Sequence, residues 1–134
     1  MTADLRALRT AAEAARRQAY APYSEFRVGA ALLCENGAVM TGCNVENSSF
    51  PAGSCAERAA LAAAVLAGQQ RFAHLVIVTD ADVPTPPCGM CRQALVEFAP
   101  ALPITSFTAA GAEEHWSLGD LLPHPFTPQS LQHR

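Results

Sequence analysis

Three cysteines and one glutamate in this sequence have the types and spacing needed for metal-assisted proton chemistry. Glu57 follows Cys55 by two residues, and Cys88 and Cys91 lie further along in a segment that begins with Pro87. Thiolates are common zinc ligands, and three protein ligands are typical of a catalytic zinc that keeps one position open for water. A carboxylate beside such a site can carry the proton that leaves the water. The sequence therefore predicts a zinc-bound water with a proton carrier next to it.

The same cysteines are compatible with two other kinds of site. The pair Cys88 and Cys91, taken alone, also fits a redox disulfide or half of a structural zinc module used for protein binding. A closed four-cysteine site would need Cys34 or Cys43, which lie in apolar strand patterns where cysteine is commonly a small buried hydrophobe. A redox pair predicts reversible disulfide formation without metal. A structural module predicts that zinc is lost when Cys34 or Cys43 is removed.

Two arginines beside the candidate ligands are suited to balance their charge. Three thiolates carry more negative charge than Zn²⁺ neutralises, so they weaken its ability to acidify water unless positive groups compensate. Arg58 directly follows the glutamate and Arg92 directly follows the last cysteine, so both can donate to the sulfurs. The alternative for either arginine is an ordinary surface ion pair. The segments at Cys55 and Cys88 begin predicted helices, whose N-terminal N–H groups also favour thiolates.

Hydrophobic periodicity indicates the elements that must position these residues. Apolar residues recur every three to four positions near the N-terminus, as in an amphipathic helix. Asn36-Gly37 between two apolar runs predicts a hairpin of antiparallel strands, and the continuous apolar run 75–78 predicts a central strand covered on both faces. The order predicts an α/β fold of three layers (α/β/α), with a mixed five-stranded sheet flanked by helices. Helices are predicted at 4–20, 55–66 and 88–98, and strands at 26–33, 38–45, 75–78, 104–108 and 115–118.

Composition narrows the class of protein. The 134 residues fit a single domain, 1–134, with room for one hydrophobic core. The formal charge of −3 and the absence of any basic cluster larger than Arg16-Arg17 argue against a nucleic acid polymer as partner. No apolar run reaches the roughly 18 residues of a membrane span. Five cysteines, an odd number, argue against a disulfide framework. We therefore predict a cytoplasmic protein that acts on a small molecule and does not bind a membrane.

The sequence resembles the cytidine deaminase family over almost its whole length. Four segments in the family's order contribute to the resemblance: 22–32, 42–47, 55–58 and 87–93. A non-ligand glutamate beside three cysteine ligands is a known pattern of zinc nucleobase deaminases. Cysteine at position 55, where relatives acting on polynucleotides or deoxycytidylate usually have histidine, indicates the free-nucleoside branch. The resemblance implies zinc-dependent hydrolysis of cytidine and deoxycytidine to uridine and deoxyuridine in pyrimidine salvage, with Glu57 as the catalytic residue. The alternative substrate is a related aminopyrimidine nucleoside such as blasticidin S.

The resemblance also implies substrate contacts outside the zinc motifs. Asn44 and Glu46, two residues apart on a strand, would share a face and contact ribose hydroxyls. An exposed strand end with a turn-forming asparagine is the plain alternative. The backbone amide of Ala56 would meet the pyrimidine carbonyl. Pro86 stands where many relatives have serine, whose backbone carbonyl receives the exocyclic amine. Proline keeps that carbonyl but has no N–H.

Aromatic residues of the family pattern imply a shared site. Phe26 would lie beside the pyrimidine, although a phenylalanine at the start of a strand is more often core. Phe126 would stack on cytosine in a neighbouring subunit's site, and Phe50 stands where relatives often have tyrosine. The implied assembly is a homotetramer with shared active sites, with nucleoside and water as its small-molecule partners. A phenylalanine that only anchors its own tail is the alternative. The four histidines match no ligand position and are predicted to be structural or surface residues: His74, His115, His124 and His133.

Overall fold

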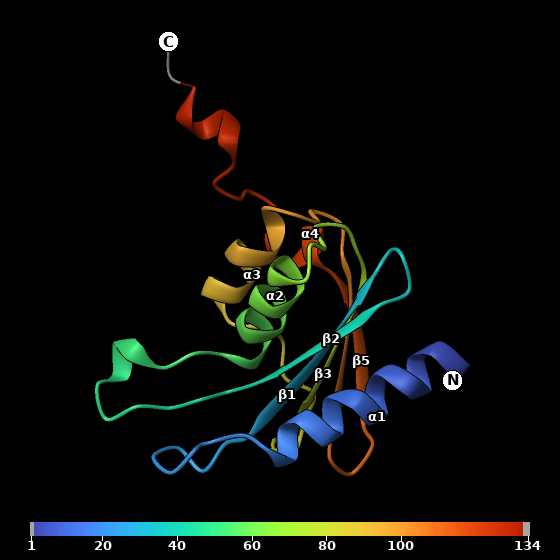
Figure 1. Ribbon diagram of the computed structural model, residues 1–134, viewed down its shortest axis with the longest axis vertical. Helices are drawn as coiled ribbons and strands as arrows, with labels where there is room; N and C mark the ends of the chain where they lie inside the picture. The colour runs from blue at the N-terminus through green and yellow to red at the C-terminus, as the bar shows by residue number, and fades with distance from the viewer. Residues whose placement is uncertain (1, 133–134) are drawn as a thin grey trace.

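A computed structural model describes residues 2–132, and in this part of the chain five strands form one sheet. The strands are β1 (Val28–Cys34), β2 (Val39–Cys43), β3 (Phe72–Thr79), β4 (Pro103–Thr108) and β5 (Glu113–Ser117). Their order is β2-β1-β3-β4-β5 (Figure 1). The β3–β4 pair is parallel and the other three pairs are antiparallel. The predicted mixed five-stranded sheet and its hairpin are confirmed.

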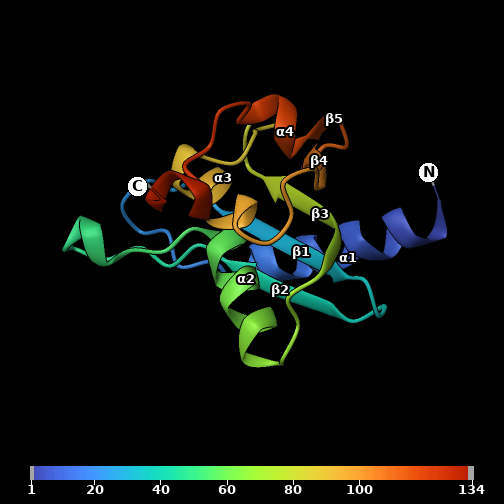
Figure 2. The same ribbon diagram turned by 90° about the horizontal axis from the view of Figure 1, so that it is seen from above.

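Helices cover both faces of this sheet. They are α1 (Ala3–Arg17), α2 (Ala56–Leu66), α3 (Gly89–Val96) and the short α4 (Leu118–Leu121), with 3-10 turns at Phe50–Ala52 and Pro128–Leu131. α1 lies on one face, and α2 and α3 lie on the other (Figures 1 and 2). Val76 and Val78 of β3 belong to the core under α1, whereas Leu75 and Ile77 belong to the core under α2 and α3. This confirms the three-layer fold, with β3 as a central strand covered on both faces.

Several element ends differ from the sequence prediction. The first helix ends at Arg17 instead of residue 20, and the last predicted strand is shifted to Glu113–Ser117 with α4 directly after it. β1 starts two residues late, after Glu25, which has a φ of 56° in the left-handed region. These ends depend on backbone turns that periodicity does not report. No helix between residues 2 and 132 combines the length and apolarity of a membrane span. His133 lies outside the described residues.

Gly29 of β1 lies where α1 crosses the sheet. A Cβ atom at this position would lie 1.9 Å from the carbonyl oxygen of Ala12 and 2.4 Å from the amide nitrogen of Arg16. Because these are backbone atoms of a packed helix, α1 would have to move away from the sheet. We expect Gly29→Ala to lower the free energy of unfolding by about 3 kcal/mol in urea titrations. Gly119→Ala is the control, since its Cβ would lie 3.5 Å from the nearest atom; equal midpoints for the two variants would contradict the expectation.

Asp80, the first residue after β3, joins three elements through two arginines. Its carboxylate accepts hydrogen bonds from the backbone N–H of Arg27 at 2.9 Å and from Nε of Arg27 at 3.1 Å. Nη1 of Arg16 also donates to Asp80, and Nη2 of Arg16 donates to Glu13 at 2.6 Å. The Arg16 side chain is only 10% exposed. This network fixes the end of β3 against α1 and the start of β1, at the point where the loop to α3 begins.

The Asp80 network should make stability depend on pH. Burial raises the pKa of Asp80, but hydrogen bonds and charge from Arg27, and the charge of Arg16, outweigh it and hold the pKa below its usual value. A carboxyl with a lowered pKa in the folded state stabilises above its unfolded pKa of about 4, and that contribution is lost as the pH falls through the folded pKa. We therefore expect the free energy of unfolding to decrease as the pH is lowered below about 4.

The Asp80→Asn variant tests this dependence. At pH 7 we expect its free energy of unfolding to be about 2 kcal/mol lower than that of the wild type, because Arg16 loses a charged partner. Between pH 5 and pH 3 we expect its free energy of unfolding to decrease less steeply than that of the wild type. Urea titrations across this range measure both quantities. Asp82→Asn is the matched control, since Asp82 is exposed in the following loop. A slope in Asp80→Asn equal to that of the wild type would contradict the assignment.

Candidate active site

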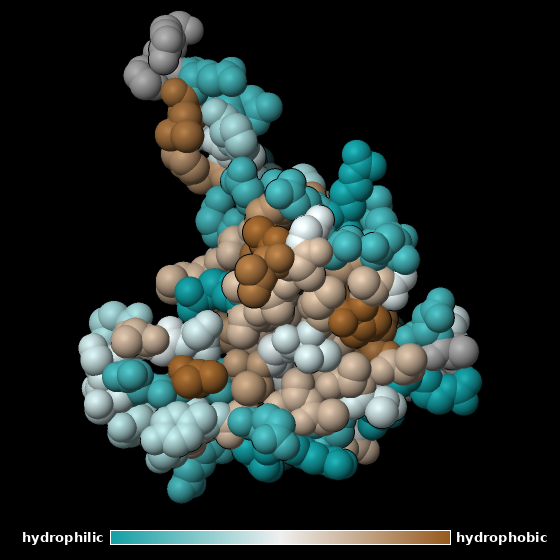
Figure 3. All heavy atoms as spheres, in the orientation of Figure 1, coloured by the Kyte–Doolittle hydropathy of each residue, from teal (hydrophilic) through white to brown (hydrophobic). Residues whose placement is uncertain are grey.

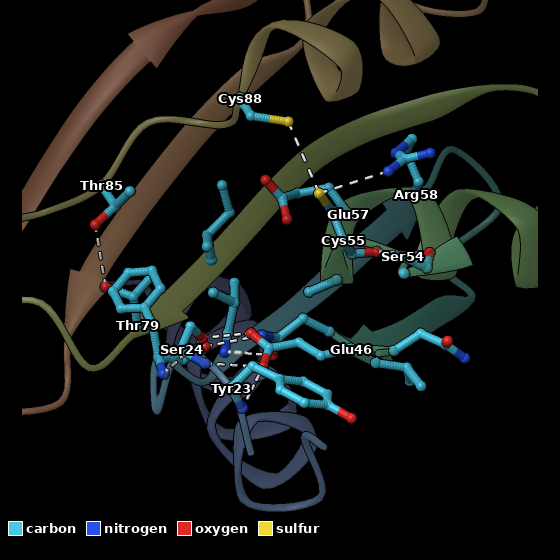
Figure 4. A pocket seen from close by; sticks show the side chains of 18 of the residues that line it. Tyr23, Ser24, Glu46, Ser54, Cys55, Glu57, Arg58, Thr79, Thr85 and Cys88 are labelled. Carbon is cyan, nitrogen blue, oxygen red and sulfur yellow. Dashed lines mark hydrogen bonds between the residues drawn. The ribbon is translucent and has the colours of Figure 1, made fainter. Parts of the chain in front are cut away.

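A pocket of about 620 Å³ opens beside the N-terminal ends of α2 and α3 (Figure 4). This volume is in the range typical of sites for small molecules. Its walls come from the segment before β1, the segment after β2, the first turn of α2 and the loop that leads to α3. The pocket lining includes Glu57, Cys55, Cys88 and Arg58. It also includes all but one of the predicted substrate contacts: Phe26, Asn44, Glu46, Ala56 and Pro86.

The three candidate metal ligands converge at one edge of this pocket. The sulfur atoms of Cys55, Cys88 and Cys91 all lie within 4.8 Å of one another, and those of Cys55 and Cys88 are 3.8 Å apart. Tetrahedral Zn–S bonds of about 2.3 Å place two sulfurs about 3.8 Å apart. Cys55 and Cys88 are the N-cap residues of α2 and α3, in agreement with the helix starts predicted at these two positions. Within residues 2–132 the cluster includes neither Cys34 nor Cys43, so a closed four-cysteine site is not supported.

The charges around the three sulfurs suit a divalent cation. Hydrogen bonding with Cys91 lowers the pKa of Cys55 to about 5, and the same contact raises the pKa of Cys91, aided by burial. The Cys55 thiolate therefore forms at the expense of Cys91, and a cation between the two sulfurs would favour ionisation of both. Nη2 of Arg58 donates to the Cys55 sulfur at 3.7 Å and adds positive charge. Nε of Arg58 is buried without a hydrogen-bond partner among the described residues. This donor set fits Zn²⁺.

Arg92 makes contacts different from those expected. Its Nε donates to the carbonyl of Pro87 at 2.8 Å, and its Nη1 donates to the carbonyl of Leu121 at 2.9 Å. Successive helix residues point about 100° apart, so a side chain next to Cys91 in sequence does not share its direction. Within residues 2–132, the hydrogen bonds of Arg92 thus hold Pro87, the residue before Cys88, and connect α3 to the end of α4.

Glu57 lies in the first turn of α2 and is only 6% exposed. Figure 4 shows its carboxylate directed toward the region of the Cys55 and Cys88 sulfurs. Burial raises the pKa of Glu57 to about 7, and charge on Cys55 also raises it, whereas a hydrogen bond from its own backbone N–H and the positive charge of Arg58 lower it. A buried carboxyl in a pocket with such a pKa can hold or release a proton near neutral pH.

Asn44 and Glu46 both line the pocket, and both also bind the backbone of this chain. Oδ1 of Asn44 accepts from the Val28 N–H and its Nδ2 donates to the Phe26 carbonyl, each at 2.8 Å. Oε1 of Glu46 accepts from the N–H groups of Tyr23 and Ser24, each at 3.0 Å, and Oε2 accepts from the Ser24 hydroxyl. These two side chains therefore shape the pocket wall in addition to facing it, a role that their spacing in the sequence did not reveal.

The pocket lining also includes residues that were not predicted from the sequence, among them Tyr23, Ser24, Thr79 and Thr85. Tyr23 and Ser24 lie in the turn that Glu46 holds, and Tyr23 also contacts Phe50 edge to face at a centroid distance of 6.2 Å. Thr79 is the last residue of the central strand β3, and Thr85 directly precedes Pro86 in the loop that follows. A usable signal existed for Thr79 alone, because polar residues at the carboxyl end of a buried central strand often face a binding site.

Phe126 does not reach the pocket of its own chain. It is 58% exposed, and its carbonyl accepts a hydrogen bond from Nε2 of Gln93 at 2.7 Å. The tail after α4 leaves the body of the molecule (Figure 1). Phe50 is 77% exposed at the end of a long projecting segment, although it contributes to the pocket rim.

Comparison with known proteins identifies close relatives of this fold and site. The family model for the cytidine and deoxycytidylate deaminase zinc-binding region matches residues 1–105. A cytidine deaminase of Sporosarcina psychrophila is 41% identical over 131 residues, which cover 97% of this chain and 96% of that protein. The crystal structure of cytidine deaminase from Burkholderia pseudomallei has 46% identity and a TM-score of 0.88, and the alignment covers 94% of this chain and 100% of the other. The cytidine deaminase structure from Mycobacterium tuberculosis has 41% identity and a TM-score of 0.81, covering 93% and 98% of the two chains.

Proposed function

Because this chain belongs to the cytidine and deoxycytidylate deaminase family, we propose that it hydrolyses cytidine and deoxycytidine to uridine and deoxyuridine with release of ammonia. The observation with the greatest weight is the group of three cysteine sulfurs within 4.8 Å of one another at a pocket that also contains the buried Glu57. Pyrimidine salvage is the setting that this reaction implies. The comparisons do not favour blasticidin S as the substrate.

We propose that Cys55, Cys88 and Cys91 hold Zn²⁺ and that Arg58 balances the charge of their thiolates. When bound, the ion acts as a Lewis acid that lowers the pKa of water. Glu57 accepts the proton of that water and donates it to the ring nitrogen next to the amine-bearing carbon, while the oxygen forms a bond to this carbon. Glu57 then takes the proton of the hydroxyl group that this carbon has gained and passes it to the amine. The carbon–nitrogen bond breaks, ammonia leaves, and the carbon keeps the oxygen as a carbonyl. Its burial keeps bulk water from competing for these transfers.

The ribose contacts proposed for Asn44 and Glu46 are compatible with their hydrogen bonds inside the chain. The Asn44 amide has two N–H donors and its oxygen has two lone pairs, and the protein occupies one of each. The Glu46 carboxylate accepts three hydrogen bonds and has a capacity of about four. The pre-formed bonds hold both side chains in place, so they lose little conformational freedom when a sugar binds.

The base contacts are proposed mainly for backbone groups. Ala56 is the first residue of α2, where an N–H has no partner inside the helix and can donate to the pyrimidine carbonyl. Pro86 lines the pocket from within the loop that leads to Cys88, and its carbonyl is suited to accept from the exocyclic amine. Phe26 lines the same pocket and provides an apolar surface for the ring.

We also propose a homotetramer with shared active sites. Figure 3 shows a broad apolar face over α2 and the neighbouring strand, to which the exposed Val39, Val65 and Leu66 contribute. The exposed Phe126 on its projecting tail would complete a neighbouring subunit's pocket, and Phe50 would lie at the same junction. The single sheet with helices on both faces supports one domain over 1–134. A cytoplasmic location is consistent with five unpaired cysteines.

Ammonia release from a panel of compounds tests the proposed activity. The panel contains cytidine, deoxycytidine, cytosine, deoxycytidylate and blasticidin S. We expect release from the two nucleosides, with little from the free base, the nucleotide or the antibiotic. The absence of release from both nucleosides with zinc-loaded protein would refute the proposal. Release from blasticidin S alone would establish the alternative substrate.

A further inference from the structure

The loop between β3 and α3 forms one wall of the pocket but has few hydrogen bonds of its own. Pro84, Pro86 and Pro87 have no N–H to donate. Among the described residues, the hydroxyl of Thr85 makes the one hydrogen bond of the stretch 82–86. Beyond this stretch, the carbonyl of Pro87 accepts from Arg92. The loop is thus attached near its middle by a single hydroxyl group.

The partner of that hydroxyl is a rigid anchor. Oγ1 of Thr85 lies 3.2 Å from Oγ1 of Thr79, which also accepts from the N–H of Ala81 at 3.2 Å. Thr79 is the last residue of β3, is 1% exposed, and pairs with Thr108 of β4. Its carbonyl accepts from the N–H of Ala109 at 3.1 Å. Figure 4 shows Thr79 and Thr85 joined across the wall of the pocket.

The prolines stiffen the loop, so the single hydrogen bond at Thr85 also positions the neighbouring residues. Each proline has a fixed φ, and a residue that precedes proline is restricted to extended conformations. These limits apply to Val83, Thr85 and Pro86 as preceding residues, so the loop is stiff and moves as a unit. A hydrogen bond at Thr85 therefore sets the place of the adjacent Pro86, which lines the pocket.

We propose that Thr79 and Thr85 are positioning residues, whose paired hydroxyls hold the proline-rich loop so that Pro86 faces the bound base. The consequence for catalysis rests on the proposed function, whereas the effect on the loop does not. The Cys88 end of the loop has separate support, because Arg92 holds the Pro87 carbonyl at 2.8 Å. Loss of the hydroxyl pair should thus displace Pro86 and leave the metal ligands in place.

Thr85→Val tests the kinetic consequence, because valine keeps the side-chain shape and removes the hydroxyl. We expect the KM for cytidine to rise about 3- to 10-fold, the effect of one neutral hydrogen bond. We expect kcat to change less than about twofold and the zinc content to stay at the wild-type level. Thr85→Ser, which retains the hydroxyl, should restore the wild-type KM. Thr79→Val with Thr85→Val should cost no more than the larger single change, because both remove the same contact. Thr41→Val, at an exposed β2 position, is the matched control.

NMR order parameters of the backbone N–H groups of residues 81–85 measure the loop without a nucleoside. We expect lower order parameters in Thr85→Val than in the wild type and Thr85→Ser, with global stability checked by urea titration. Thr85→Ala provides a second variant if Thr85→Val fails to fold. Unchanged order parameters with an unchanged KM would overturn the proposal, and so would a raised KM with unchanged order parameters, which would indicate direct substrate contact. If the wild type deaminates no nucleoside, the proposed function fails, but the order parameters still decide whether the hydroxyl pair holds the loop.

Discussion

Glu57→Gln is expected to lower the kcat for cytidine by at least about 10²- to 10⁴-fold while zinc stays bound. The carboxylate is proposed to move protons in more than one step, and glutamine has the same shape but accepts and releases none. The side chain is buried at the pocket, so no bulk water substitutes for it. Because burial already favours the uncharged form of Glu57, neutral glutamine should not destabilise the fold.

Steady-state ammonia release and zinc content per chain measure these effects together. Glu97→Gln is the control, because Glu97 is an exposed glutamate at the end of α3. A large loss of kcat with full zinc occupancy would support proton transfer by Glu57. Turnover close to the wild-type rate in Glu57→Gln would exclude the mechanism, and loss of zinc would instead indicate that Glu57 acts on the metal site.

Cys91→Ser is expected to abolish both zinc binding and deamination. The Cys91 side chain is fully buried in the cluster, and a serine hydroxyl does not ionise at neutral pH to replace the thiolate. We expect zinc affinity to fall by more than the roughly 100-fold that follows loss of a supporting group around a metal ligand. Competition with a colorimetric chelator measures this loss. Urea titrations with and without zinc separate weak binding from unfolding.

Cys43→Ser is the matched control for the metal site. Cys43 is a half-buried cysteine of β2 that does not belong to the sulfur cluster found within residues 2–132. We expect it to keep both zinc and activity. Zinc retained at full affinity in Cys91→Ser would contradict the proposed ligand set. Loss of zinc in Cys43→Ser would instead support a closed four-cysteine site with Cys43 as the fourth ligand.

The metal cluster could be predicted because the features that indicate it, cysteine spacing and helix starts, lie within short stretches of the sequence. Cys88 and Cys91 are near neighbours in the chain, and Cys55 and Cys88 each follow a polar, proline-containing loop that leads into a helix. Helix starts, the Asn36-Gly37 hairpin and the buried strand at 75–78 likewise depend on short-range preferences and on burial periodicity. A family resemblance across four motifs added the substrate class, which spacing alone did not provide.

Hydrogen-bond partners could not be predicted in the same way, because they depend on which distant segments meet. Arg92 follows a metal ligand in sequence but binds Leu121 and Pro87, since the helix turns its side chain away. Asn44 and Glu46 appeared as free ribose contacts, yet both are anchored to the segment before β1. Local preferences do not encode such pairings, and a chain of this length offers many partners for each polar group.

By itself, the sequence determined the three thiols, the adjacent carboxylate and the kinds of element that present them. The tertiary structure alone decided how these parts form a pocket. Sheet order β2-β1-β3-β4-β5 brings the segment before β1 and the loop after β3 to the N-terminal ends of α2 and α3. It also places Thr85 against Thr79, a contact with no signature in composition or spacing. The physical reason is that side-chain type sets which interactions are possible, whereas packing of the whole chain sets which of them are within reach.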